Sequence, residues 1–352
     1  MKHYFSLILF LTAVLITISC KSEITKPEEQ LKSPLEMTWT ADTLDYPGSY
    51  QVLMFSIWGS SADNVWTCGF HDRSITTVWH YNGKAWSYYD LFKDIDRSAL
   101  DFKKVFGFSA NNVWMTGERL LEYNSNTDTW TRRPLIINFN GSKWIEHVVK
   151  ANNIFINDVW GTEANNVFCS GYGEIWNYNG SIWKKETIGD STLVISGVRE
   201  TKGGKFMLAI KPQTATTPHT TYFYKYELNK WKIMDSTLYS RNFGQKLYVS
   251  NSGKLYSYGW EGVFLYEGGQ WLKQIQYYLA VEDMIAVNDK YILAVGQGGR
   301  AFFNNGSECV NIKDINISSA VYRSVWSNGT EVFIVGNLVN SVPMKTIVWH
   351  GK

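Results

Sequence analysis

Six side chains in this sequence have the chemistry to bind a ligand or to take part in bond cleavage. Three are arginines, whose planar guanidinium groups hold a carboxylate through two parallel hydrogen bonds. A tyrosine and a glutamate two residues apart could supply the nucleophile of a glycosidase, and one loop tryptophan could stack on a sugar or a peptide. The alternative is that these charges only solvate loops and that the tryptophan has a packing role. The candidate binding residues are Arg73, Arg119, Tyr172, Glu174, Trp260 and Arg300, and we assign none of them a catalytic role.

Histidine and cysteine, which often carry chemistry, do not form a site in this sequence. His80 and His350 occupy the same place in two related phrases, VWHYNGK and VWHGK, which indicates a structural role. Cys68, Cys169 and Cys309 lie too far apart for the close ligand spacing of a zinc site, and they are too few for a disulfide framework. We therefore expect three buried thiols, no metal and no cofactor.

A repeated element must position the candidate residues. The stretch SIWGSSADNVWTCG (Ser56 to Gly69) returns as VFGFSANNVWMTG (Val105 to Gly117) and as VWGTEANNVFCSG (Val159 to Gly171). A glycine after an apolar strand recurs at a mean spacing of about 44 residues, close to the length of a four-stranded propeller blade. Consecutive apolar residues such as Val65 and Trp66 are typical of a sheet covered on both faces. The repeat predicts an all-β propeller.

Each repeat is predicted to hold four strands. In the first repeat an Asn/Asp/Ser turn joins the first two strands, and the pair Asn82-Gly83 joins the last two. Asn-Gly predicts a two-residue turn in which both residues have positive φ. These short turns are expected on one face of the ring. The longer loops, after the second and the fourth strands, are expected on the other face, where a rigid scaffold with variable loops usually binds its partners.

The two ends of the chain predict how the ring closes. The last repeat ends at IVWHGK (Ile347 to Lys352) before its fourth strand, whereas EMTWTADTL (Glu36 to Leu44) holds Trp39 with no earlier strand to pair with. We expect this N-terminal strand to complete the last blade and to remove the free edges. The marker residues then predict seven four-stranded blades. In the second repeat, either Trp144 rather than Trp130 marks the fourth strand or the repeat carries an extra hairpin.

The phrases YNGKAW and YNGSIW resemble the Asp-box (BNR) turn of sialidase-like propellers. The longer repeat is similar to those of bacterial secreted and lipoprotein β-propellers, over residues 36–352. This resemblance implies a propeller fold. Asn82, Asn179 and Glu267 stand near the place of the Asp-box aspartate. Because the Asp-box is a structural turn, the resemblance implies no catalytic residue.

The N-terminus is predicted to be a targeting segment. Residues 1–20 begin with a positive charge, continue with an apolar run from Phe5 to Ile18 that is too short to span a bilayer, and end at Cys20. They resemble a bacterial lipoprotein signal, in which Cys20 becomes the lipidated first residue; an ordinary cleaved secretion signal is the alternative. Residues 21–35 then form a flexible tether and residues 36–352 the propeller. We expect an exported protein, lipid-anchored to a bacterial membrane on its periplasmic side or at the cell surface.

The composition narrows the range of partners. The formal net charge is +2 over 352 residues, without a Lys/Arg tract, so we expect no nucleic-acid partner. The preferred hypothesis is a monomeric, non-enzymatic binding or scaffold module for an envelope protein or glycan. The alternative is a carbohydrate-active enzyme, a sialidase-like hydrolase or a lyase, with its site in the central mouth. The first predicts exposed aromatic or apolar residues on the loop face, and the second predicts paired carboxylates beside arginine.

Overall fold

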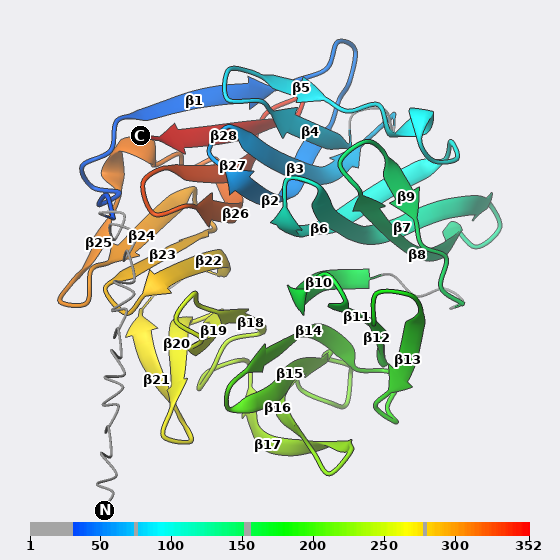
Figure 1. Cartoon of the computed structure of the whole chain (residues 1–352), viewed down its shortest axis with the longest axis vertical. Helices are drawn as coiled ribbons and strands as arrows, with labels where there is room; N and C mark the ends of the chain where they lie inside the picture. The colour runs from blue at the N-terminus through cyan, green and yellow to red at the C-terminus, as the bar shows by residue number, and fades with distance from the viewer. Residues whose placement is uncertain (1–30, 74–76, 151–155, 277–279) are drawn as a thin grey trace, which may run out of the picture.

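The structure is a computed structural model that describes residues 31–73, 77–150, 156–276 and 280–352. These residues form 28 strands and two short 3-10 helices, η1 (Leu91–Lys93) and η2 (Lys313–Ile315). Antiparallel sheets surround a common centre, which is the arrangement of a β-propeller (Figure 1). Within the described ranges, no helix is long and apolar enough to cross a membrane. Cys20 and the signal segment lie outside the described residues.

Five sheets have four strands each, and the remaining sheet has eight. The four-stranded sheets are β10 (Ile156–Glu163), β11 (Asn166–Gly171), β12 (Glu174–Tyr178) and β13 (Trp183–Thr187); β14 (Val194–Thr201), β15 (Gly204–Lys211), β16 (Thr220–Glu227) and β17 (Lys230–Leu238); β18 (Lys246–Val249), β19 (Leu255–Gly259), β20 (Gly262–Glu267) and β21 (Gln270–Ile275); β22 (Val281–Asn288), β23 (Tyr291–Gly296), β24 (Arg300–Asn304) and β25 (Cys309–Asn311); and β26 (Ala320–Ser327), β27 (Val332–Leu338), β28 (Lys345–Gly351) and β1 (Trp39–Leu44). The eight-stranded sheet holds β2 (Val52–Ser61), β3 (Asn64–His71), β4 (Val78–Tyr81), β5 (Trp86–Tyr88), β6 (Ala99–Ser109), β7 (Asn112–Asn124), β8 (Thr129–Phe139) and β9 (Trp144–Glu146).

The prediction of seven separate four-stranded blades is therefore wrong. The described chain contains five four-stranded sheets, and strands β2 to β9 form one continuous sheet because β3 pairs with β6. The cause is the unequal length of the strands. β4 pairs with β3 only from Val65 to Cys68, which leaves backbone groups at the end of β3 without a partner strand. Phe70 pairs with Asp101 of β6 at this point, which satisfies groups that would be costly to bury alone.

The N-terminal strand completes the sheet of the C-terminal strands, as the two chain ends predict. β1 lies antiparallel to β28, with paired residues from Trp39 and Gly351 to Leu44 and Thr346. Leu44 is fully buried, and Met37, just before the strand, is 6% exposed. The sheet is thus closed by segments from opposite ends of the sequence.

The chain reaches β1 from the face that carries the short turns. Lys32 donates its backbone N–H to the carbonyl of Gly329 at 2.9 Å, and the side chain of Leu31 lies beside the same glycine. Gly329 belongs to the turn between β26 and β27, the first two strands of their repeat. The N-terminal end of the described chain is therefore placed on the short-turn face.

The Asn-Gly phrases form hairpin loops, but the predicted two-residue turn is wrong. The loop between β4 and β5 has four residues, Asn82 to Ala85, and only Gly83 of the Asn-Gly pair has positive φ, +86°. The Asn82 side-chain oxygen accepts hydrogen bonds from the backbone N–H groups of Lys84 and Ala85, at 3.1 and 3.0 Å. Asparagine therefore supports the loop through its side chain rather than through its own φ. The same pair of bonds recurs at Asn140, Asn179 and Asn305.

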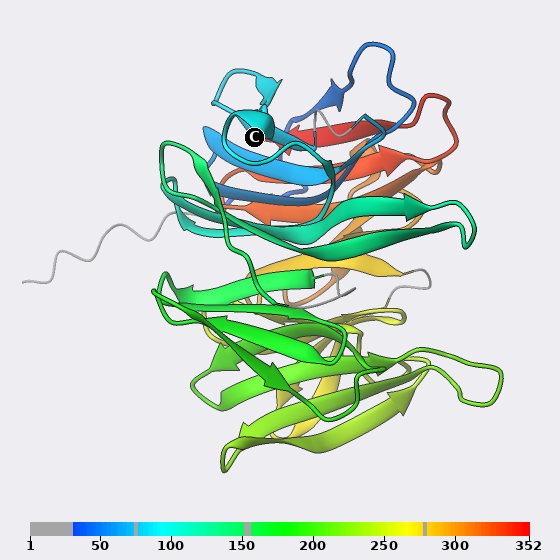
Figure 2. The same ribbon diagram turned by 90° about the vertical axis from the view of Figure 1, so that its right-hand side faces the viewer.

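Trp144 marks the fourth strand of the second repeat. It lies on β9 and is 1% exposed, whereas Trp130 lies on β8 and is 42% exposed. The β7 and β8 strands continue past Leu120, the last residue of β7 that pairs with β6. They form a long hairpin in which the rings of Tyr123 and Trp130 lie 5.3 Å apart. Figure 2 shows this teal hairpin projecting from one face of the molecule.

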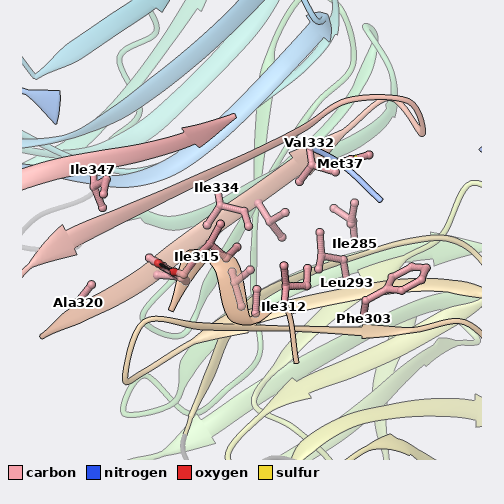
Figure 3. Close-up of a cluster of buried hydrophobic side chains, with 14 of the residues drawn as sticks. Met37, Ile285, Leu293, Phe303, Ile312, Ile315, Ala320, Val332, Ile334 and Ile347 are labelled. Carbon is pink, nitrogen blue, oxygen red and sulfur yellow. Dashed lines mark hydrogen bonds between the residues drawn. The ribbon is translucent and has the colours of Figure 1, made fainter. Parts of the chain in front are cut away.

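Apolar side chains fill the space between neighbouring sheets. Figure 3 shows one of these clusters, which joins the β22–β25 sheet to the sheet that β1 closes. Leu293 and Phe303 of the first sheet pack with Val332 and Ile334 of the second, and Met37 belongs to the same cluster. The short apolar strands thus gain their stability from burial between sheets, as the non-alternating sequence pattern indicates.

The two repeated histidines have the structural role that the sequence predicts. His80 stacks on Trp66 with ring centroids 4.1 Å apart, and His350 stacks on Phe333 at 3.8 Å. Burial lowers the pKa of both imidazoles below the usual value of 6.5. Both rings therefore serve as neutral packing groups on the third strands.

Two of the three predicted buried thiols are confirmed. Cys68 and Cys169 are buried on second strands, and burial raises the pKa of both thiols well above the usual value. The prediction is wrong for Cys309, which is exposed. It lies on β25, the outermost strand of its sheet, where one edge and part of one face meet solvent.

Candidate binding site in the central channel

The first strand of each repeat faces the centre of the ring. These inner strands are β2, β6, β10, β14, β18, β22 and β26; each contacts the next, and β26 contacts β2, so they enclose a channel. All of them except β18 shift their register against the second strand near their start, which is the mark of a β-bulge. A bulge re-aims side chains by adding one unpaired residue. The residue pairs at the bulges are Phe55-Ser56, Lys103-Lys104, Asn157-Asp158, Ser196-Gly197, Glu282-Asp283 and Arg323-Ser324.

The recurring glycine of the repeat lies opposite the bulge. Gly69 pairs with Met54, directly before the bulge of β2, and Gly117 pairs with Phe102, directly before the bulge of β6. A Cβ atom at either glycine would lie 2.0 Å from a backbone carbonyl oxygen of the inner strand. The bulged backbone comes so close that only glycine fits. The recurring glycine in the sequence therefore indicates the position of the β-bulge that shapes the channel.

The first residue of each bulge pair contributes to a ring of side chains around one end of the channel. Inner strands begin at this end, after the loops that join successive repeats, so the ring opens on the long-loop face. The residues line a cavity of about 340 Å³, within the size range of ligand pockets. Lys246 of β18, the inner strand without a bulge, joins these six residues in what we name the mouth ring: Phe55, Lys103, Asn157, Ser196, Lys246, Glu282 and Arg323.

The second residue of several bulge pairs ties neighbouring inner strands together. Ser324 accepts a hydrogen bond from the backbone N–H of Ile57 at 3.2 Å, and Ser56 accepts one from Val105 at 3.1 Å. Asp283 accepts a backbone N–H of β26 at 3.3 Å. These positions are polar because each supplies an acceptor to a buried backbone donor of the adjacent strand.

Two buried carboxylates of the channel are engaged inside the protein. Asp283 accepts hydrogen bonds from the Ser324 hydroxyl at 2.5 Å and from the Tyr258 hydroxyl at 3.1 Å. Burial, together with the charge of Asp283, raises the pKa of Tyr258 well above its usual value, so this hydroxyl keeps its proton. Asp158 accepts two bonds from the Arg199 guanidinium, at 2.5 and 3.3 Å. Both carboxylates thus act as structural acceptors.

Two cations of the channel have unused donors. The Lys104 ammonium lies 3.7 Å from Asp283 and donates no hydrogen bond within the described part of the chain. The Arg323 guanidinium lies 3.5 Å from Glu282, and its Nε is buried without a partner among the described residues. Lys246 shares Glu282 at 3.9 Å. Five cations and three carboxylates line the cavity, so it carries net positive charge and free N–H groups, which suits an anionic group.

The six residues predicted from sequence do not form one site. Five lie where second strands end or third strands begin, on the long-loop face, and Arg119 lies within β7; the six are spread over four sheets. None of them lines the channel cavity. Their role as binding residues stays a prediction.

Most of these six residues have structural contacts of their own. Arg119 is 3% exposed and donates to Glu146 at 2.5 Å. Glu174 pairs with Lys185 at 3.0 Å, and Tyr172 forms a backbone bridge with Val194. Arg73 is exposed in the loop after β3, and Arg300 is exposed as the first residue of β24.

Trp260 is linked to the mouth through a short chain of contacts. It is 47% exposed in the β19–β20 turn and stacks on His219, with ring centroids 5.8 Å apart and an interplanar angle of 16°. His219 lies 3.0 Å from the side-chain amide of Gln245, which lines the cavity. Tyr50 and Val342, 70% and 88% exposed, lie on other loops of this face. The long-loop face therefore carries exposed aromatic and apolar groups around the mouth.

Sequence reasoning missed Lys104 and Arg323. A signal was present, because each belongs to an adjacent polar pair that directly precedes an apolar-aromatic pair of the repeat: KKVF ends at Phe106, and RSVW ends at Trp326. Two neighbouring polar residues in an otherwise apolar strand do not fit simple alternation. A bulge explains this pattern, since the extra residue allows both polar side chains to face away from the apolar layer between the sheets.

Comparison with known proteins supports the fold. No protein-family model matches this sequence, and no curated protein matches it. Among solved structures, YCF48 bound to D1 peptide is similar, with a TM-score of 0.60 and 12% identity over 89% of this chain and 96% of that one. YCF48 from Cyanidioschyzon merolae has a TM-score of 0.57 and 15% identity, covering 87% of this chain and 98% of its own. The WD40 propeller domain of Doa1 has a TM-score of 0.58 and 12% identity, covering 89% of this chain and 97% of its own. These similarities show a β-propeller.

In the described residues, no group of three or more His, Cys, Asp or Glu side chains is arranged to hold a metal ion. The donors that do converge are the basic groups of the channel.

Proposed function

We propose that this protein is a non-enzymatic binding module of the bacterial envelope, held at a membrane by a lipid on Cys20. Its channel mouth binds an acidic segment of a partner protein. The observation that carries this proposal is the pair Lys104 and Arg323, two cations with unused donors that line one cavity. Hydrogen bonds from such groups to a carboxylate are stronger than bonds between neutral groups. A carboxylate in the cavity would accept hydrogen bonds from the unused donors of both side chains.

The surroundings of the mouth support a protein segment as the ligand. Trp260, Tyr50 and Val342 offer exposed aromatic and apolar area on separate loops of the same face, and such residues are common anchors in protein interfaces. A propeller of similar fold, YCF48, has been solved with a D1 peptide bound. A rigid ring with a polar mouth and an apolar surround fits an extended chain that places one acidic side chain at the centre.

The carbohydrate-active alternative has less support. A glycosidase of the usual kind needs two carboxyl groups that flank the scissile bond and are free to exchange protons or to attack. Asp158 and Asp283 are held by Arg199, Ser324 and Tyr258. Arg119, a candidate for carboxylate binding, is committed to Glu146.

The test measures binding of labelled peptides to the full-length protein in nonionic detergent. One peptide carries two glutamates in a Gly/Ser background, and its partner carries glutamines instead. Replacing Lys104 and Arg323 together by glutamine should weaken binding of the glutamate peptide by about 10- to 100-fold, the value of one or two charge-assisted hydrogen bonds. The matched control replaces Lys84 and Lys143, which lie in short loops of the opposite face, and should leave binding unchanged.

The proposal fails if both peptides bind equally well or if the double variant binds as the wild type does. If an acidic oligosaccharide such as a trigalacturonate binds and neither peptide does, the ligand is a glycan rather than a protein segment.

A further inference from the structure

The half of the channel below the mouth is lined by aromatic rings. A second cavity of about 280 Å³ lies between the inner strands, nearer the short-turn face. Five aromatic side chains from five inner strands contribute to its wall, and all are half-buried in spite of their central position. We name this space the aromatic chamber, formed by Trp58, Phe106, Trp160, Tyr248 and Trp326.

The repeat itself builds the chamber wall. In the phrases IWG and VFG, the aromatic residue follows the bulge by two positions and a glycine follows it directly. The ring of Trp326 reaches Gly59 of the next inner strand, and the ring of Trp58 reaches Gly107 of the one after. A Cβ at Gly107 would lie 2.6 Å from the Trp58 ring, so the glycine provides the space into which the ring extends. The rings thus bridge adjacent strands and close the wall between them.

The aromatic chamber adjoins the charged mouth. Lys104, Arg199, Tyr258 and Asp283 line both cavities. Arg199 also lies over the ring of Trp160, 5.5 Å from its centroid. A ligand group held by Lys104 therefore lies next to a space whose aromatic side chains are only half-buried.

We propose that the aromatic chamber receives a large apolar side chain of the same segment whose acidic group binds at the mouth. The inference rests on the proposed function and specifies its ligand: an acidic residue close in sequence to a phenylalanine, tryptophan or leucine. The chamber is large enough, because a cavity of about 150 Å³ already binds benzene. The charge of Lys104 and Arg323 fixes which end of the ligand faces the mouth. Burial of one such side chain should tighten binding by about 10- to 100-fold.

The experiment compares three labelled peptides on the full-length protein in nonionic detergent. The first carries two glutamates and one phenylalanine, the second has alanine for phenylalanine, and the third has glutamines for glutamates. The first should bind about 10- to 100-fold more tightly than the second. Trp326→Leu should remove most of this difference, whereas Trp130→Leu, in the exposed β7–β8 hairpin and outside both cavities, should leave it intact.

A second measurement starts from the wild-type protein and uses more conservative replacements. A peptide with 4-bromophenylalanine, whose heavy atom quenches nearby indoles, should quench tryptophan fluorescence of the wild-type protein. The quenching should shrink when Trp58, Trp160 and Trp326 are replaced by phenylalanine, which keeps an aromatic wall, and should persist in Trp130→Phe, which lies outside both cavities.

The outcomes separate the two proposals. Equal affinity for the phenylalanine and alanine peptides, with both still requiring glutamate, would overturn the aromatic chamber as a binding site and leave the mouth site standing. Failure of both glutamate peptides to bind would overturn both proposals. A phenylalanine-dependent gain that survives Trp326→Leu, with quenching that survives the triple replacement, would place the apolar contact elsewhere and refute the chamber.

Discussion

At the scale of single residues, the glycine that recurs in the repeat is required by the lack of space for a side chain rather than by its backbone conformation. Gly69 and Gly117 are absent from the described glycines with positive φ, so their conformation does not require glycine. What requires it is the carbonyl oxygen of the neighbouring bulge, which a Cβ would meet at 2.0 Å. The asparagines of the hairpin loops follow the same logic, because Asn82 acts through its side-chain oxygen. The repeated glycines thus allow the bulges that shape the channel, and the repeated asparagines stabilise the hairpin loops.

Replacing Gly117 by alanine should lower the free energy of unfolding by about 3 kcal/mol, the upper end of the usual cost of overpacking a core. The new methyl group meets backbone, which cannot move aside as a side chain can. Urea unfolding followed by tryptophan fluorescence would measure the loss. Gly203→Ala is the control, since its nearest neighbour would lie at an ordinary 3.4 Å. Equal stability of the two variants would contradict the role assigned to the bulge.

At the scale of strands and sheets, much of the architecture could be predicted from the sequence and some of it could not. The four-strand repeat, the two faces and the pairing of β1 with β28 follow from marker residues such as Trp39 and the Asn-Gly phrases. The pairing of Phe70 with Asp101 could not be predicted, because it depends on β4 being too short to cover β3. Trp130 was a misleading marker because an aromatic pair also stabilises the exposed β7–β8 hairpin.

The residues of the candidate site are harder to predict from sequence than the strands. Residues expected in loops, such as Arg73 and Arg300, were selected because loops usually bind, yet the cations with free donors lie on inner strands. Their direction depends on bulges, and a bulge is a register property of two paired strands rather than of one sequence segment. The glycine opposite the bulge, such as Gly69 or Gly117, is the sequence signal that indicates the bulge.

Deletion of Met37 to Thr43 should destabilise the whole ring. β28 would lose its outer partner along its length, and the buried Met37 side chain would be removed from the cluster between two sheets. We expect the free energy of unfolding to fall by at least about 3 kcal/mol, the order of two buried apolar side chains. A control that changes only exposed β1 side chains, Thr40→Ala with Asp42→Ala, should unfold as the wild type does. A native melting temperature after the deletion would refute the closure by β1.

At the scale of the whole molecule, the two faces of the ring differ in structure. The mouth ring opens on the long-loop face, and Leu31 and Lys32 contact the short-turn face at Gly329. If Cys20 carries the proposed lipid, the segment that leads to it leaves the ring on the short-turn face, opposite the mouth. The β7–β8 hairpin then extends in the same direction as the mouth (Figure 2).

Replacing Cys20 by serine should release the protein from membranes. Fractionation of cells that express the variant should recover it in the soluble fraction, while the wild type stays with the membranes until detergent is added. Lys21→Ser is the matched control, because it changes the adjacent residue and leaves the thiol. Membrane retention of the serine variant would contradict the anchor.

The position of β1 has a mechanical consequence. A partner held at the mouth and an anchor attached before Leu31 would pull on opposite sides of the disc, and β1 is the first strand to carry that load. Its pairs with β28, from Trp39–Gly351 to Leu44–Thr346, lie side by side along the strand. A pull along β1 therefore strains these pairs together, in shear, rather than opening them one after another. The pairing of β1 with β28 would thus resist tension between the proposed anchor and the proposed partner.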